Sequence, residues 1–127
     1  KIWNATRFVL MQDEGNKNPS FAKATKGRDK KLLKDFEKLE KDITRDMDNF
    51  RFYIAAEKIY HYFWHTFCDK IIEDYKKKEV GHEALLTILS ESLKILHPFM
   101  PFITEEIYQQ LPIKNKQKCL MVESWTK

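Results

Sequence analysis

The stretch LHPFMPFITEEIY, from Leu96 to Tyr108, decides the fold, because it holds two prolines three residues apart among large apolar side chains. A proline inside a helix removes a backbone hydrogen bond and clashes with the preceding turn. The residue before a proline is also kept out of the helical region. One helix is therefore predicted to end near His97, and the next to begin after Pro101. Thr104 is a candidate hydroxyl cap for that next helix.

Apolar side chains elsewhere recur with the period of a helix. The spacings of three and four over residues 28–49 predict an amphipathic helix with one buried stripe. Residues 51–78 are apolar over a wider arc, which is typical of a central helix, and residues 83–96 are amphipathic again. Residues 1–12 form a short helix candidate. The predicted stripe of residues 28–49 comprises Leu32, Leu33, Phe36, Leu39, Ile43, Met47 and Phe50.

The segments between these helices are short or polar. Residues 13–27 hold two glycines and a proline and are predicted to be a loop. Residues 112–127 form a tail that leads to the next segment, with one short extended stretch at Cys119–Val122. The sequence therefore predicts a single all-α domain over residues 1–127, a bundle of about four to five helices. Its predicted core, or the edge of that core, includes Phe63, Phe67, Leu85, Leu89, Phe99 and Phe102.

Composition narrows the class of protein. The chain has 127 residues, 43% of them hydrophobic, and a formal charge of +4, so it can fill a core and tolerates an anionic partner. No apolar run approaches the length of a membrane span. Cys68 and Cys119 show no zinc or CxxC spacing, so we expect reduced thiols in an intracellular, cytoplasmic protein. Because Lys1 lies inside a predicted helix, we also expect this domain to belong to a longer protein.

A polar stripe on the central helix is the main candidate for chemistry. His61, His65 and Asp69 are four residues apart, so they could bind a metal and serve a metal-dependent enzyme. The same spacing also describes the solvated edge of an apolar helix, as does the whole stripe. Cys68 beside His65 lacks an activating motif and is expected to be packed. The complete stripe consists of Glu57, His61, His65, Asp69 and Glu73.

No catalytic constellation stands out. The chain has neither a glycine-rich phosphate loop nor a Ser/His/Asp arrangement, so we predict no catalytic residue, no metal ligand and no cofactor in this chain. The lysine runs Lys76–Lys78 and Lys114–Lys118 are solvated faces or nucleic-acid contacts. The residues alone therefore predict a basic helical binding module, and a protein-binding bundle without any RNA role stays open.

Four blocks together point to a family. They are KIWNATRFVLM (1–11), FWHTFCDKIIE (63–73), LHPFMPFITEEIY (96–108) and LMVESW (120–125), and they span nearly the whole chain. In this order they resemble the anticodon-binding domain of class I aminoacyl-tRNA synthetases, and within that class the valyl-tRNA synthetase family. The isoleucyl and leucyl families also place a proline-broken corner and a Glu-Glu pair here, and they remain the nearest alternatives.

The resemblance implies a function for the domain. In the family this bundle follows the catalytic domain and receives the anticodon stem-loop of tRNA(Val), while the proline corner holds two helices at a sharp angle. The parent enzyme joins valine to its tRNA with ATP and Mg²⁺, and it carries catalytic and editing domains whose signatures this chain lacks. The fragment is therefore expected to bind RNA and to do no chemistry itself.

The resemblance also suggests which side chains meet the anticodon. Unstacked loop bases stack on aromatic rings and are read along their edges. Valine anticodons end in A and C, and both bases carry an exocyclic amino group. A carboxylate such as that of Glu73 can accept a hydrogen bond from this group. The predicted RNA-binding residues are Arg7, Phe8, Ile72 and Glu73, with Asn4, Asp69 and Lys76 as second choices.

Overall fold

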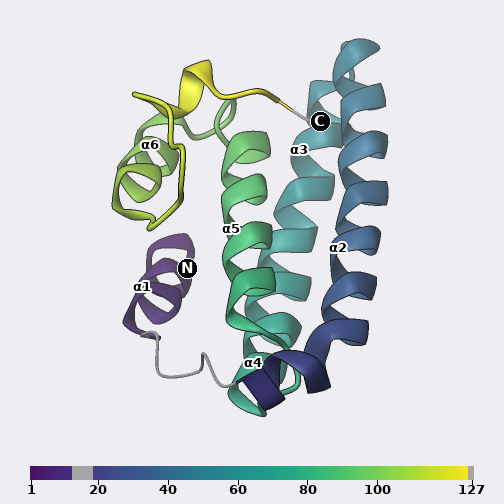
Figure 1. Ribbon diagram of the computed structural model, residues 1–127. Coiled ribbons are helices and arrows are strands. Elements are labelled where there is room, and N and C mark those ends of the chain that lie inside the picture. The colour runs from purple at the N-terminus through teal and green to yellow at the C-terminus, as the bar shows by residue number, and fades with distance from the viewer. Residues whose placement is uncertain (13–18, 126–127) are drawn as a thin grey trace.

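Long helices that lie side by side form the body of the molecule (Figure 1). The computed structural model describes residues 1–12 and 19–125, with side chains for residues 1–12 and 25–125. No strand occurs in those residues, so the all-α prediction is confirmed. The helices are α1 (Ile2–Met11), α2 (Pro19–Asp48), α3 (Phe52–His61), η2 (Tyr62–Ile71), α4 (Ile72–Lys76), α5 (His82–Leu96), α6 (Pro101–Gln110) and η3 (Leu120–Val122).

Helix α2 begins earlier than the sequence pattern predicts. Residues 19–27 are helical, so the loop prediction is wrong there, while residues 13–18 lie outside the described part. Pro19 occupies the first helical position, where its missing N–H costs no hydrogen bond. The alanines and lysines that follow are good helix formers, and Gly27 is tolerated inside the helix with no neighbouring atom within 4 Å of an added Cβ. The glycine and proline were therefore poor markers of a loop.

The predicted stripe of α2 faces the core over most of its length. Phe36 and Ile43 are buried, but Phe50 is 79% exposed, so its assignment to the stripe is wrong. The helix ends at Asp48, and Phe50 takes a left-handed conformation with φ 58°, which turns its side chain out to solvent. The half-buried members that pack on the core are Leu32, Leu33, Leu39 and Met47.

Helices α3, η2 and α4 run on as one continuous central helix from Phe52 to Lys76. Its buried residues recur every fourth position, and such a stripe would drift by about 40° per step around an ideal α-helix. The segment Tyr62–Ile71 is wound more widely, with π-type i→i+5 bonding, and this winding opposes the drift. The buried stripe comprises Ala55, Ile59, Phe63, Phe67 and Ile71.

The proline corner separates α5 from α6 as predicted. Helix α5 ends at Leu96, and α6 begins at Pro101. Thr104 does not cap α6, contrary to prediction, because the helix has already started and the Thr104 hydroxyl donates back to the Met100 carbonyl at 2.7 Å. His97 Nδ1 lies 2.8 Å from the same hydroxyl oxygen. The contact between His97 and Thr104 thus links the residue that follows α5 to α6 across the corner.

The orientation of α6 decides which aromatic side chain of the corner is buried. Thr104, Ile107 and Tyr108 face inward at helical spacing. Phe102 lies two positions before Thr104, which places it about 200° around the helix, and it is 91% exposed. The prediction of Phe102 at the core is therefore wrong, whereas Phe99 does pack against the core.

The tail folds back over α6 and reaches α2. Lys116 donates to the carbonyl oxygens of Tyr108, Gln109 and Leu111 at 3.2, 2.7 and 3.3 Å, which satisfies the end of α6. The predicted extended stretch at Cys119–Val122 is wrong, because Leu120–Val122 form a 3₁₀ turn. Trp125 Nε1 then donates to Thr44 Oγ1 at 3.0 Å. Nowhere in the described residues is there a helix suited to crossing a membrane.

Candidate nucleic-acid interface

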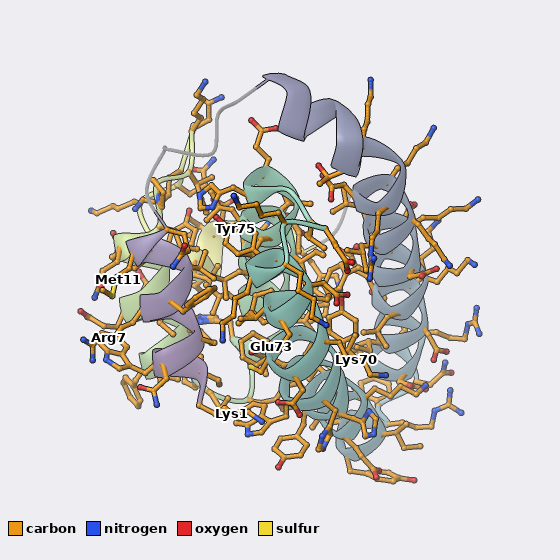
Figure 2. All side chains as sticks on the ribbon, turned by 90° about the horizontal axis from the view of Figure 1, so that it is seen from below. Lys1, Arg7, Met11, Lys70, Glu73 and Tyr75 are labelled. Carbon is orange, nitrogen blue, oxygen red and sulfur yellow. The ribbon has the colours of Figure 1, made fainter. Side chains whose placement is uncertain are left out.

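Helix α1 presents one face to the bundle and the other to solvent. Ile2, Ala5, Thr6 and Val9 are buried. The predicted RNA-binding residues Asn4 and Arg7 are exposed on the opposite side. Figure 2 shows Arg7 pointing outward from α1, away from the central helix. Arg7 is therefore placed to meet an external anion.

Phe8 lies at the boundary between α1 and α4. Its ring is half-buried and meets the Tyr75 ring edge-on, with 6.1 Å between the centroids. The ammonium of Lys76 lies 5.2 Å from the centroid of the Phe8 ring, within the range of a cation–π interaction. The ring is thus held in place by α4 while part of its surface stays open to solvent.

Glu73 and Lys76 complete a small cluster around this ring. Lys76 Nζ lies 2.7 Å from Glu73 Oε1, and the two side chains are 49% and 52% exposed. We call Phe8, Glu73 and Lys76 the Phe8 cluster. It brings an aromatic ring, a cation and a carboxylate together on one surface, although Phe8 lies 65 positions before Glu73 in the sequence. Such a set can stack a base, neutralise a phosphate and accept from an exocyclic amino group.

Two other predicted RNA-binding residues, Ile72 and Asp69, lie outside the Phe8 cluster. Ile72 is only 6% exposed and belongs to the core beneath the Phe8 cluster. Asp69 is exposed, and its carboxylate lies 3.1 Å from Lys1 Nζ and 3.7 Å from His65 Nδ1. Its ion pair with Lys1 fastens the start of α1 to the central helix. The structure therefore joins Phe8, Glu73 and Lys76 closely, while Ile72 is part of the hydrophobic core.

The end of the bundle near the Phe8 cluster is also rich in cations. Arg28 of α2 bridges Asp74 and Glu79 at 2.7 and 2.9 Å, which ties the lower part of α2 to the end of α4. Asp29 Oδ1 accepts from the Gly81 backbone N–H at 3.0 Å, in the turn before α5. Sequence reasoning missed the lysines of α2 as binding candidates, although the run RDKKLLKDF already signalled them.

The histidine stripe does not assemble a metal site in the described residues. The His61 and His65 rings lie 4.8 Å apart between centroids. No group of three or more His, Cys, Asp or Glu side chains in the described part of the chain is arranged to hold a metal ion. Burial raises the pKa of the Cys68 thiol, which disfavours the thiolate that a nucleophile requires. These side chains offer no support for the alternative of a metal-dependent or cysteine enzyme.

Comparison with known proteins gives one family. Residues 29–127 match the protein-family model described as "Anticodon-binding domain of tRNA ligase". The chain is 40% identical to the valine–tRNA ligase of Thermotoga maritima over 131 residues, covering 98% of this chain and 15% of that relative. It is 39% identical to the valine–tRNA ligase of Fervidobacterium nodosum over 132 residues, with the same two coverages. The chain thus spans about 15% of the length of these relatives.

Proposed function

Because the chain belongs to the family of anticodon-binding domains of tRNA ligases, we propose that it is the anticodon-recognition domain of a valine–tRNA ligase. In this role it receives the anticodon stem-loop of tRNA(Val) and positions the tRNA for a catalytic domain outside these residues. The named relatives, all of them valine–tRNA ligases, support valine over isoleucine and leucine.

The Phe8 cluster carries the proposal. The Phe8 ring offers a stacking surface for an unpaired loop base, which is the usual target of sequence-specific RNA recognition. The Glu73 carboxylate accepts from the amino group of the last anticodon base, and Lys76 then exchanges its ion pair for a phosphate. Arg7 and Asn4 on the outer face of α1 contact the adjoining backbone, and Asp69 lies one helical turn before Glu73. Ile72 supports this surface from the core.

Activation of valine takes place elsewhere in this proposal. ATP and Mg²⁺ are bound by the catalytic domain, and the editing domain belongs to the same parent chain. The described side chains do not form a site for Mg²⁺, because no group of them is arranged to hold a metal ion. The sequence offers no site for ATP, because it has no glycine-rich phosphate loop. Both cysteines are free thiols, which suits the cytoplasm that we propose as the location.

The test measures base discrimination by variants of the cluster. Binding of the 127-residue chain is compared for tRNA(Val) and for the same tRNA with its last anticodon base changed. A good carboxylate-to-base contact is worth about 1–3 kcal/mol of discrimination, so Glu73→Ala is expected to reduce the affinity ratio by about fivefold or more. Lys76→Gln, the matched control, removes the neighbouring charge and is expected to weaken both RNAs equally.

Two outcomes contradict the proposal at different levels. If Glu73→Ala retains full discrimination while its circular dichroism spectrum is unchanged, Glu73 does not read the base. If the wild-type chain binds both tRNAs equally, with no dependence on the anticodon, the assignment of anticodon recognition to this surface fails.

A further inference from the structure

The solvent-facing side of α2 carries a row of lysines that the proposed anticodon site does not use. Phe36 and Ile43 mark the buried side of this helix. At 100° per residue, four of the lysines of residues 26–38 lie about 120–160° around the helix from Phe36, on the opposite side, and Lys26 lies about 80° from it, at the flank. All of them are exposed. We call this set the α2 lysine row, and it consists of Lys26, Lys30, Lys31, Lys34 and Lys38.

None of these five cations forms an ion pair with another described residue. The next two cations on the same face differ, since Lys41 lies 2.9 Å from Glu37 and Arg45 lies 3.9 Å from Asp42. Hydrogen bonding to Lys41 also holds the pKa of the Glu37 carboxyl below its usual range. Lys34 of the row also lowers the pKa of Glu37, but as the smallest of the causes, so Glu37 is held mainly by Lys41 and forms no ion pair with the row.

Two further carboxylates lie within the row's sequence range, and neither blocks it. Asp29 is half-buried, and its Oδ1 accepts from the Gly81 N–H. Asp35 is exposed at the flank of the face, about 100° from Lys34. Residues 26–38 thus carry six cations and three anions, with Arg28 and Asp29 already engaged by other parts of the bundle.

The spacing of the row suits a regular polyanion. Lys30, Lys34 and Lys38 are each four residues apart, which places successive charges about 6 Å apart along the helix axis. A nucleic-acid strand carries one negative charge on every nucleotide, so it can meet such a row at several points. Residues 26–48 of α2 offer no exposed aromatic ring for base stacking. The row can therefore contribute affinity but not readout of sequence.

The end of α4 lies between the α2 lysine row and the Phe8 cluster, and Arg28 of α2 connects it to α2. Arg28, at the start of the row, pairs with Asp74 and Glu79 on either side of Lys76–Lys78. Figure 1 shows α4 beside the lower end of α2. In Figure 2 the central helix lies between α1 and α2, so the solvent-facing side of α2 is a second surface and not part of the Phe8 cluster.

From this geometry we propose that the α2 lysine row binds the sugar–phosphate backbone of RNA without reading its sequence. The inference rests on the proposed function only in taking RNA as the partner. RNA that reaches the Phe8 cluster continues past the lysines at the end of α4 onto α2. The row then increases the affinity and the association rate for any RNA, whereas the Phe8 cluster supplies the discrimination.

The test compares two double variants on the same helix face. Lys34→Gln with Lys38→Gln removes two unpaired cations, and Lys41→Gln with Arg45→Gln removes two paired ones. Binding to tRNA(Val), to tRNA with a changed anticodon and to polyuridine is measured between 50 and 200 mM salt. Each lost phosphate contact lowers the slope of log K against log salt by about 0.7–0.9 units, or about five- to eightfold in affinity at 0.1 M salt.

The expected result is a loss of slope and affinity for all three RNAs in the first double variant, and a much smaller loss in the second. Equal losses in both variants would show that only net charge matters and would overturn the proposal. So would equally strong, equally lysine-dependent binding to polyglutamate, which would favour an acidic protein partner. If wild-type binding ignores the anticodon while the row still governs polyuridine binding, the proposed function fails and this inference stands.

Discussion

Replacing Phe63 by alanine tests the placement of the central helix. Phe63 is 0% exposed, and its ring stacks on Phe67 with 5.1 Å between the centroids. Alanine leaves a cavity in a cluster that the neighbouring helices can close only in part, so we expect a loss of about 3–5 kcal/mol in the free energy of unfolding. A domain of this size is stable by about 5–15 kcal/mol, so the expected loss is a large fraction of the total.

Urea denaturation followed by circular dichroism measures the effect. With an m-value of about 2 kcal/mol per M, a loss of 4 kcal/mol lowers the midpoint by about 2 M. Phe102→Ala is the matched control, because the same atoms are removed from a ring that is 91% exposed, and it should change stability by no more than about 0.5 kcal/mol. A loss below 1 kcal/mol at Phe63, or equal losses at both positions, would refute the packing argument.

Two further predictions concern the α2–α3 connection. A hydrogen bond from Lys58, at 2.5 Å, holds the pKa of Asp46 below its ordinary value of 3.8. The stability that this pair contributes is therefore present above about pH 4 and lost as the pH falls through the lowered pKa. Asp46→Asn should flatten that part of the acid unfolding curve, and an unchanged curve would contradict the assignment. Phe50→Gly should stabilise the chain by about 0.5–1 kcal/mol, because glycine adopts the left-handed conformation without a Cβ clash; a lower melting temperature would contradict this.

The candidate site was only partly accessible from the sequence. The resemblance directed attention to Phe8 and Glu73, and the structure places both beside Lys76. Ile72 lies in the apolar arc of residues 51–78, and its burial agrees with that pattern rather than with an exposed RNA-contacting position beside Glu73. The α2 lysine row was visible in the sequence, but the absence of ion pairs between these five lysines and the other described residues is a property of the folded surface.

Apart from the first turns of α2 and the position of Phe50, helix periodicity by itself determined the long helices and their buried faces, since the spacing of apolar side chains fixes which side of a helix avoids water. It also determined the break between α5 and α6, because proline acts on its own backbone. Tertiary structure alone decided the outward position of Phe102, the 3₁₀ turn at Leu120–Val122 and the meeting of α1 with α4. These features depend on contacts between residues far apart in the chain. The free energy of such contacts exceeds the local conformational preferences, and the contacts produce no periodic pattern in the sequence.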